Sequence, residues 1–331
     1  MVYPRVSFII PIYNSAHLIK DCLKSIKKQK YPKSKIEILM PDGGSKDDGS
    51  KIAKELGAKV VNNPKILAEP GFMLGANMAT GDLTVYMGAD NRLGDSNWIN
   101  KMIKPFEDSR IIAAFPWHRS YPKSSWLTKY FNSFTDPINH FVLGSAANAL
   151  YFHRAYRAIK KNKDYVIYDF FIDNFPMLAF DQGFTVRKSY KRPKETEYDD
   201  ILPVLDMIKK KMRIAFVPNA SNYHITLDKG IGQFLKKMRW IIDNNISGKS
   251  EFGFPTRRNY LSNERRLRFI LWPFYAASII LPILNALFGL IRDRKKEWLF
   301  HPFITYIMLF LVGYELLRIK IFRRRSLVSR Q

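Results

Sequence analysis

The sequence predicts an α/β fold with a mostly parallel sheet flanked by helices, followed by an amphipathic helix and a pair of apolar helices. Within the first hundred residues, short apolar runs typical of buried strands alternate with stretches whose apolar residues recur at helical spacing. After residue 228, long uncharged runs lie between clusters of basic residues, a pattern typical of segments that contact a membrane.

The N-terminal elements are expected to alternate between strand and helix. Ligands of parallel sheets bind beyond the carboxyl ends of the strands. The segments PIYN, PDGGS and GADN each follow a strand and are therefore expected to line one crevice. Ser15 is the expected N-cap of the first helix, and Gly81 is the expected end of the third. The expected strands are residues 6–12, 35–40, 58–63 and 82–87, and the clearest helices are 15–29 and 72–81.

Composition and charge exclude several classes of protein and of binding partner. The single cysteine, Cys22, excludes a disulfide framework and a cysteine-based zinc site. The N-terminal segment is too short and too strand-like for a signal peptide, so we expect the globular part in the cytosol. Of the net charge of +25, residues 229–331 contribute +14, from 20 Lys and Arg against 6 Asp and Glu. Basic residues beside apolar runs favour anionic lipid headgroups over nucleic acid, for which no recognition motif is present.

The C-terminal third contains three apolar patterns. Residues 231–243 form a basic amphipathic helix of the interfacial kind, although packing of this helix on the protein itself is equally compatible with the pattern. Phe269–Ile291 holds 23 residues without a charge, which as a helix would reach roughly 34 Å and cross a bilayer core of about 30 Å. Trp298–Tyr314 is a second uncharged run. We expect this pair to insert into a membrane, and a buried helical hairpin is the alternative.

The orientation of this pair stays open. Basic residues precede it, follow it and also fill its six-residue link, RDRKKE. The positive-inside rule would place all three segments in the cytosol, which a spanning hairpin does not allow. Pro273 and Pro282 interrupt the first run. A spanning pair and a re-entrant or in-plane hairpin are therefore both compatible with the sequence.

Four stretches, in this order, resemble glycosyltransferase family 2 over about residues 5–225: VSFIIPIYNSAHLIKDCLKSI, PDGGSKDD, ATGDLTVYMGADN and YDDILPVLDMIKKKMRIAFVPNASNYH. The resemblance implies the glycosyltransferase A fold and transfer of a sugar from a nucleotide-sugar donor with inversion. The expected regions are residues 1–228 as the catalytic domain, 229–262 as an interfacial helix and linker, and 263–331 as a membrane-associated helical hairpin with a basic tail.

The resemblance places the nucleotide at the ends of the first two strands. It implicates Pro11 and Tyr13 in the nucleotide pocket, and Asp42 as the acid that binds the base. A carboxylate only accepts hydrogen bonds and therefore suits a ring N–H of uracil or guanine. Gly44 allows close approach of the backbone. The alternative for Asp42 is an Asx turn.

The segment Gly88–Ala89–Asp90 corresponds to the D-x-D signature of the family, which contacts the nucleotide-sugar and a cation. Asp90 is the second acid, whereas Gly88 replaces the first and lacks its donor contact. The resemblance implies that Asp90 binds Mn²⁺ or Mg²⁺, which neutralises the leaving diphosphate. In some family members a histidine at the position of His224 joins the metal shell, and a structural hydrogen bond is the alternative. Upstream, Phe72 and Met73 replace a basic and an amide residue that family members often carry.

The catalytic base is expected in the segment YDDIL. The Glu-Asp pair of the family corresponds to Asp199 and Asp200. Inverting transfer needs one carboxylate that takes the proton of the attacking hydroxyl, and we assign Asp200, with Asp199 in reserve. The alternative is a pair of acids favoured by a helix N-terminus. Arg239 and Trp240 are similar to an Arg-Trp dipeptide of membrane-bound members, so Arg239 is expected to contact the diphosphate, with membrane packing as the alternative.

The resemblance therefore implies an inverting transferase at the cell membrane, with its catalytic domain in the cytoplasm. It would move one sugar from a UDP- or GDP-sugar to a polyprenyl phosphate, a glycolipid or a lipid-linked saccharide, with no nucleic acid partner. The alternative is a catalytically weak relative that binds nucleotide-sugar and acts as a membrane-bound partner of another transferase.

Overall fold

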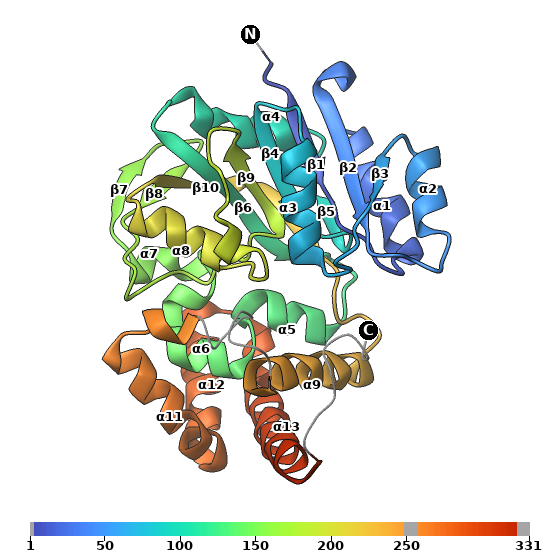
Figure 1. Ribbon diagram of the computed structural model, residues 1–331. Helices are drawn as coiled ribbons and strands as arrows, with labels where there is room; N and C mark the ends of the chain where they lie inside the picture. Colours follow the sequence, from blue (N-terminus) through green and yellow to red (C-terminus); the bar gives the residue numbers. More distant parts are fainter. Residues whose placement is uncertain (1–2, 248–256, 323–331) are drawn as a thin grey trace. The chain divides into compact units, whose positions relative to one another are not determined.

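The computed structural model describes residues 3–247 and 257–322, which fold into two compact units (Figure 1). The first unit runs to Arg119 and includes Phe152–Ile172 and Leu178–His224. The second unit contains Ser120–Tyr151, Asp173–Met177 and the chain from Ile225 onward. Its last boundary lies close to the division expected after residue 228. The segments 120–151 and 173–177, however, which the sequence analysis included in the catalytic domain, belong to the second unit.

The first unit contains one mixed sheet, ordered β3-β2-β1-β4-β9-β6-β10-β8-β7, with β5 paired to β10. Strands β3, β2, β1 and β4 are parallel, as predicted. The pairs β4–β9, β9–β6, β10–β8, β8–β7 and β10–β5 are antiparallel, so the expectation of a mostly parallel sheet holds only for the N-terminal half. The strands are β1 (Val6–Ile9), β2 (Ile36–Asp42), β3 (Lys59–Asn62), β4 (Leu83–Met87), β5 (Asn91–Leu93), β6 (Ile111–Ser120), β7 (Ala158–Lys161), β8 (Val166–Tyr168), β9 (Gln182–Arg187) and β10 (Arg213–His224).

Helices cover both faces of the parallel half, because its strands are apolar on both sides. Phe8 and Ile10 pack with Cys22 and Leu23 of α1 in one core. Ile9 points the other way, where a Cβ at Gly75 of α3 would collide with it. The helices of this unit are α1 (Ala16–Lys27), α2 (Gly49–Glu55), α3 (Ala68–Met78), α4 (Trp98–Ile103), α7 (Phe152–Ala155) and α8 (Leu202–Lys209), with short turns η1 (Lys33–Lys35), η2 (Lys104–Glu107) and η5 (Lys194–Thr196).

Of two predicted helix ends, one is confirmed and one is wrong. Ser15 is the N-cap residue of α1, as predicted, but its hydroxyl donates to the carbonyl of Tyr13 at 2.9 Å and does not cap the helix. The carboxylate of Asp47 accepts from Ala16 N at 2.8 Å instead and so satisfies the start of the helix. Helix α3 ends at Met78 rather than Gly81. Gly81 is needed for close packing, because a Cβ there would lie 2.8 Å from the backbone nitrogen of Ser7 in β1.

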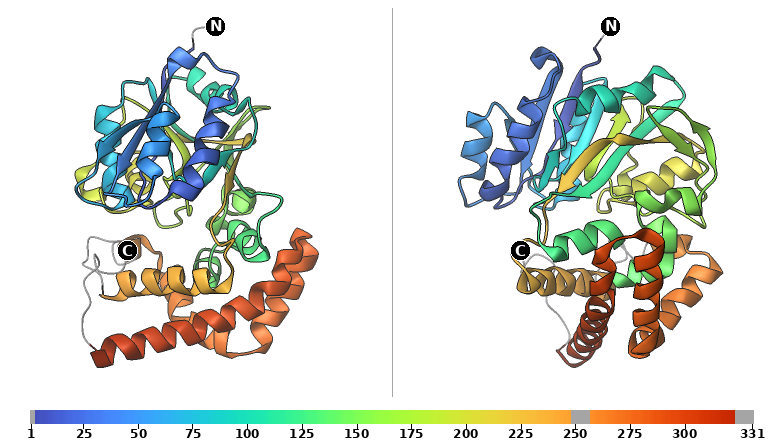
Figure 2. Two further views of the ribbon diagram at one scale, coloured as in Figure 1. Left: turned by 90° about the vertical axis from the view of Figure 1, so that its right-hand side faces the viewer. Right: turned by 180° about the vertical axis from the view of Figure 1, so that it is seen from behind.

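The second unit is helical. Helix α9 lies beside α13 (Figure 2). Phe234, Met238 and Ile242 of α9 are buried in a core that also contains Ile304 and Met308 of α13. The apolar stripe predicted for residues 231–243 therefore packs largely within the protein, although Ile231 and Trp240 stay exposed. The elements are α5 (Trp126–Phe134), α6 (Pro137–Leu143), η3 (Gly144–Ala147), η4 (Ala149–Tyr151), α9 (Ile231–Ser247), η6 (Arg258–Tyr260), α11 (Asn263–Ala277), α12 (Ile280–Asp293), η7 (Lys296–Phe300) and α13 (His301–Phe322).

The expected C-terminal helix pair is instead three helices. The uncharged run 269–291 is divided between α11 and α12, which meet at an angle of 102°. In a continuous helix, the ring of Pro282 would clash with the carbonyl of Ser278. Proline also has no N–H, so this carbonyl would lose its helical hydrogen bond. The chain therefore breaks at Ser278–Ile279. Among the described residues, one helix alone, Lys296–Arg318, has the length and the mean hydropathy, 1.5, to cross a membrane. The bent pair adds a second span only if it is counted as one interrupted segment.

Candidate active site

The turns after β1 and β2 are joined by hydrogen bonds into one surface. Ile12 bridges to Asp42 in parallel fashion, and Gly43 N donates to the Ile12 carbonyl at 2.9 Å. Asn14 N donates to Ser45 Oγ at 3.0 Å, and Asn14 Oδ1 accepts from Lys46 N at 2.9 Å. The structure thus brings together the turns that carry Pro11, Tyr13, Asp42 and Gly44, as predicted for parallel strand ends.

Asp42 is held in an Asx turn, the alternative that the sequence left open. Its Oδ1 accepts from Ser45 N at 2.9 Å, from Ser45 Oγ at 2.7 Å and from Gly44 N at 3.2 Å, while Ser50 Oγ donates to Oδ2. Burial alone would raise the pKa of Asp42, but the hydrogen bonds from Ser50, Ser45 and Gly44 outweigh it and lower the pKa below its usual value. Gly44 has a φ of +88°, which glycine adopts without strain. The carboxylate is therefore fixed and charged at neutral pH.

Asp90 lies beside His224, with Asp90 Oδ2 and His224 Nε2 3.1 Å apart. The sheet explains this contact, because His224 at the end of β10 pairs with Asn91 at the start of β5. Asn91 Nδ2 donates to Asp90 Oδ1 at 2.9 Å, and Asn91 Oδ1 accepts from Asn222 at 3.0 Å. The two residues that we predicted as metal ligands from positions 134 apart in the sequence are thus adjacent.

This pair fits two corners of a divalent cation site. Ligands about 2.1 Å from an octahedral cation lie about 3.0 Å apart when adjacent, which matches the 3.1 Å between Asp90 Oδ2 and His224 Nε2. Within residues 3–247 and 257–322, no group of three His, Cys, Asp or Glu side chains is placed to hold a metal. A cation here would therefore take its other ligands from diphosphate oxygens and water, as Mg²⁺ commonly does.

The surroundings of Asp90 account for Gly88. A Cβ at Gly88 would lie 2.6 Å from Asp90 Oδ1 and 3.1 Å from Asn91 Nδ2. His118 of β6 is a neighbour that the sequence analysis missed, with its ring centroid 4.8 Å from that of His224. Its only sequence signal is a polar residue late in an apolar strand. Because Gly88 has no side chain, it leaves space for the Asp90 carboxylate in its present orientation.

We expect Gly88→Ala to lower the rate of sugar transfer by at least about tenfold, because small displacements of a catalytic group have large effects on rate. The added methyl group would push Asp90 Oδ1 away from its present position. Steady-state kinetics at several Mn²⁺ concentrations measure this effect. Gly232→Ala, where a Cβ meets no atom within 4 Å, is the control and should leave the rate unchanged. Equal rates for the two variants would show that Asp90 need not keep this orientation.

The two candidate bases differ in environment. Asp199 is 2% exposed, and its Oδ1 accepts from Ile201 N at 2.6 Å and Leu202 N at 2.8 Å, at the start of α8. Asp199 thus fills the helix-terminus role that was the alternative for both acids. Asp200 is only partly buried, and its carbonyl accepts from Phe180 N at 2.9 Å. These environments favour Asp200 as the base.

A short path of backbone hydrogen bonds connects Asp200 with the Gly88 turn. Phe180 binds the Asp200 carbonyl, and the next residue, Asp181, accepts from Gly88 N at 2.8 Å. The loop before α8 is held further by Arg192, which donates to the carbonyls of Thr196 at 2.6 Å and Asp199 at 2.8 Å. The backbone segments of the candidate base and the candidate metal ligand are thereby connected through Phe180 and Asp181.

Glu69, near the start of α3, is another acid that the sequence analysis did not single out. Its pKa is raised from the ordinary 4.5 to about 7, chiefly by burial; the charge of Asp200 contributes to the rise, and Arg192 opposes it. The charges of Asp200 and Arg192 both act on Glu69, so these three side chains belong to one cluster. Glu69 therefore gains and loses its proton near neutral pH, in the same cluster as the candidate base.

We expect Glu69→Gln to stabilise the protein increasingly as pH rises. The folded pKa of about 7 exceeds the ordinary value of 4.5, so ionisation of Glu69 costs stability from about pH 4.5 upward and levels off above pH 7. The gain in the free energy of unfolding should be about 1 kcal/mol at pH 5 and about 3 kcal/mol at pH 8. Urea unfolding at both pH values measures it, with exposed Glu55→Gln as the control. A gain that is equal at both pH values would contradict the raised pKa.

Arg239, expected at the diphosphate, belongs to the second unit. Its Nε donates to Glu315 Oε1 at 2.5 Å, and its guanidinium lies 5.6 Å from the ring centre of Tyr314. Glu315 is fully buried and also accepts from Arg318. These contacts give Arg239 a packing role between α9 and α13. A contact with the donor remains a prediction.

Comparisons with known proteins relate this chain to glycosyltransferases. The sequence profile of glycosyl transferase family 2 matches residues 7–178. Glycosyltransferase AglE of Haloferax volcanii is 28% identical over 141 residues, which cover 40% of this chain and 46% of that protein. A dolichyl N-acetyl-alpha-D-glucosaminyl phosphate 3-beta-D-2,3-diacetamido-2,3-dideoxy-beta-D-glucuronosyltransferase of Methanococcus voltae is 35% identical over 91 residues, or 25% of this chain and 28% of that protein. The chain thus matches less than half the length of these relatives.

The fold has a counterpart among solved structures. A mannosyltransferase from Pyrobaculum calidifontis, in complex with GDP-Man and Mn²⁺, superimposes with a TM-score of 0.54 and 15% identity, over 96% of this chain and 88% of that one. The likeness supports the predicted glycosyltransferase A fold. Because the family profile covers more than half of the 331 residues, this chain belongs to glycosyl transferase family 2 and is a glycosyltransferase.

Proposed function

We propose that the protein transfers one sugar from a UDP- or GDP-sugar to a membrane-bound acceptor, with a divalent cation and with inversion. The observation that carries this proposal is the Asp90–His224 pair, joined through Phe180–Asp181 to the segment of Asp200. It combines a cation site for the leaving diphosphate with a carboxylate for the incoming nucleophile. One displacement at the anomeric carbon by such a pair of groups inverts its configuration.

Each residue has a distinct role in this proposal. Asp90 and His224 would hold Mn²⁺ or Mg²⁺, and the cation would supply positive charge for the leaving diphosphate. Asp42, kept charged by its hydrogen bonds, accepts from the base of the nucleotide. Asp200 takes the proton of an acceptor hydroxyl as that oxygen attacks. If the acceptor is a lipid phosphate, its oxygen is already anionic, and Asp200 then positions it.

The named ligands of similar proteins support this choice of substrates. The mannosyltransferase from Pyrobaculum calidifontis binds GDP-Man and Mn²⁺, and the relative from Methanococcus voltae is named for a dolichyl-linked sugar phosphate. Both the donor class and the lipid-linked acceptor class of the proposal have a counterpart among them. The proposal extends these properties to the present chain.

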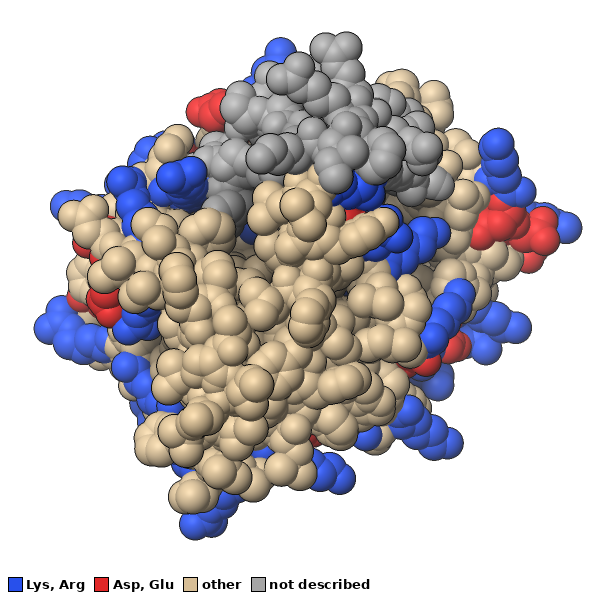
Figure 3. All heavy atoms as spheres, turned by 90° about the horizontal axis from the view of Figure 1, so that it is seen from below, with Lys and Arg blue, Asp and Glu red and all other residues tan. Residues whose placement is uncertain are grey.

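The surface of the second unit supports a membrane location. Of the 24 exposed large hydrophobic side chains among the described residues, 19 lie between Leu267 and Leu317. Figure 3 shows a broad uncharged area bordered by lysine and arginine side chains. Ile270, Phe274 and Ile291 are 63–78% exposed, and an exposed apolar area of this extent is typical of a membrane or partner surface. We propose that α11–α13 contact the cytoplasmic leaflet of the cell membrane, with the sharply bent α11–α12 pair lying in it rather than across it.

A catalytically weak, nucleotide-sugar-binding relative is the second candidate. Phe72, which replaces a basic residue of the family, is 3% exposed and packs on Tyr86 with ring centres 5.8 Å apart. It therefore supplies no charge to a diphosphate. Gly88, the other departure, is explained by the room that Asp90 needs and favours neither candidate.

Acceptor-dependent release of nucleoside diphosphate tests the function. The full chain in detergent or nanodiscs is assayed with a panel of UDP- and GDP-sugars, prenyl phosphates and glycolipids. We expect release with at least one pair, loss of release with EDTA and recovery with Mn²⁺ or Mg²⁺. Nucleotide binding without release over the panel would favour the weak relative, and neither binding nor release would contradict both candidates.

A further inference from the structure

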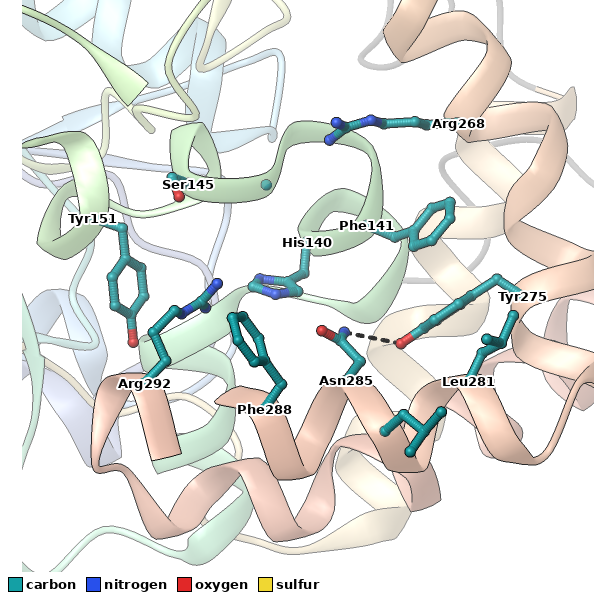
Figure 4. A pocket seen from close by; sticks show the side chains of 12 residues that line it. His140, Phe141, Ser145, Tyr151, Arg268, Tyr275, Leu281, Asn285, Phe288 and Arg292 are labelled. Carbon is teal, nitrogen blue, oxygen red and sulfur yellow. Dashed lines mark hydrogen bonds between the residues drawn. The ribbon is translucent and has the colours of Figure 1, made fainter. Parts of the chain in front are cut away.

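A cavity of about 520 Å³ lies within the second unit, enclosed by α6, η3 and η4 on one side and by α11 and α12 on the other (Figure 4). Its residues all belong to this unit, so its shape does not depend on the first unit. The cavity combines an apolar wall with a polar interior. Such a combination is typical of sites for small amphiphilic ligands.

The apolar wall comes from α12. Leu281, Leu284 and Phe288 line the cavity and are also 48–61% exposed. These three side chains belong to the exposed apolar surface between Leu267 and Leu317 that we assign to the membrane. A lipid chain that lies along them would stay in contact with apolar surface from the cavity to the bilayer.

The interior carries a hydrogen-bonded group in which Tyr275 and His301 are buried and Asn285 is partly buried. Asn285 Nδ2 donates to Tyr275 Oη at 3.0 Å, and Tyr275 Oη lies 3.1 Å from His301 Nε2. His301 Nδ1 lies 2.7 Å from Tyr130 Oη. These contacts fix the orientation of Asn285 and Tyr275, which face the cavity together with His140. The interior is thus polar.

The positive charge of the cavity comes from Arg268 of α11 and Arg292 of α12 (Figure 4). Burial and the neighbouring Arg292 lower the pKa of His140 to about 4, so this histidine is neutral. Arg292 binds Asp293 through Nε and Nη2, and Arg268 binds Glu264 through Nη2 at 2.6 Å. Among the described residues, Nη1 of both arginines makes no hydrogen bond to the protein, and both groups are partly exposed at the cavity.

We propose that this cavity binds a lipid with a phosphate in its headgroup. Arg268 and Arg292 supply the positive charge that attracts the phosphate, and the hydrocarbon chain lies along Leu281, Leu284 and Phe288. Guanidinium groups form charge-assisted hydrogen bonds with phosphate oxygens, and the polar side chains of Asn285 and Ser145 contact the rest of the headgroup. The volume accommodates a phosphate with several further heavy atoms. A phosphate-bearing lipid fits the charge, the apolar wall and the exposed surface at once.

Direct binding to the full chain in detergent micelles tests this proposal and needs no sugar transfer, so it is independent of the proposed function. Native mass spectrometry and thermal shift are measured with a prenyl phosphate, the prenol of the same chain length, phosphatidylglycerol and inorganic phosphate. We expect a phosphorylated lipid to bind at least about tenfold more tightly than prenol or free phosphate. The tighter binder of prenyl phosphate and phosphatidylglycerol shows whether the cavity takes a prenyl phosphate or a membrane phospholipid.

Arginine variants locate the site. Arg268→Gln and Arg292→Gln should each weaken binding of the phosphorylated lipid about tenfold or more and leave binding of prenol unchanged. Arg266→Gln and Arg294→Gln, on the same segments but outside the cavity, are matched controls and should bind as the wild type does. Within the described part of the chain, Arg268 forms an ion pair with exposed Glu264 alone, so we expect Arg268→Gln to fold even if Arg292→Gln, which loses the pair with buried Asp293, does not. Equal binding of phosphate lipid and prenol, or full binding by Arg268→Gln, would overturn the proposal.

Discussion

Asp90→Asn is expected to lower the rate of sugar transfer by a factor on the order of 10²–10³, because it removes the negative charge that fixes the cation at the leaving diphosphate. The amide keeps the size of the side chain and its contact with Asn91. Nucleoside diphosphate release at saturating donor, measured over a range of Mn²⁺ concentrations, records the loss. A higher concentration of Mn²⁺ should recover part of the activity if His224 still contributes a ligand.

Asp95→Asn is the matched control for this experiment. Asp95 lies five residues further along the chain and pairs with partly exposed Lys101 at 2.7 Å. Its loss should change the rate less than twofold, as is usual for surface ion pairs. Unchanged activity of Asp90→Asn would remove the metal role of Asp90 and with it the main support for the proposed mechanism.

Asp200→Asn should lower transfer to a hydroxyl acceptor by a factor on the order of 10²–10⁴, the usual contribution of a general base. Donor binding should persist, because the Asp90–His224 pair and the turn at Asp42 are separate from this side chain. The comparison of kcat with the Kd of the nucleotide separates these two effects. For a lipid phosphate acceptor the loss should be smaller, because no proton has to be removed.

Asp199→Asn provides the contrast within the same pair. The Asp199 carboxylate is buried and binds two backbone N–H groups of α8, so its loss should destabilise the protein by about 1–2 kcal/mol. Thermal unfolding measures this, and the rate per folded molecule should stay close to that of the wild type. A catalytic loss that is larger in Asp199→Asn than in Asp200→Asn would reverse the assignment.

The parallel half of the fold could be predicted from the sequence because its strands are short, apolar and separated by helical patterns. The same reasoning placed Pro11, Asp42 and Asp90 at strand ends, where the structure has them. The antiparallel half of the sheet was harder to predict from the sequence. Its strands occur out of chain order, and the sequence contains no local signal that β9 inserts between β4 and β6.

The details of the site depend on contacts between distant segments. The proximity of Asp90 and His224 follows from the β5–β10 register, which no local pattern specifies, and the sequence analysis took it only from the family resemblance. Glu69, Arg192 and His118 lie near the candidate site through packing alone and were missed. In the second unit, the break between α11 and α12 was indicated by Pro282, but an uncharged run of 23 residues suggested one continuous segment.

The most direct test of the proposed cation site is calorimetric titration of the full chain with UDP and GDP, with and without Mn²⁺. We predict that Mn²⁺ tightens binding of at least one nucleotide by about tenfold or more in the wild type and has little effect in Asp90→Asn or His224→Ala. Equal affinity with and without Mn²⁺, or full Mn²⁺ dependence in Asp90→Asn, would contradict a cation held by Asp90 and His224.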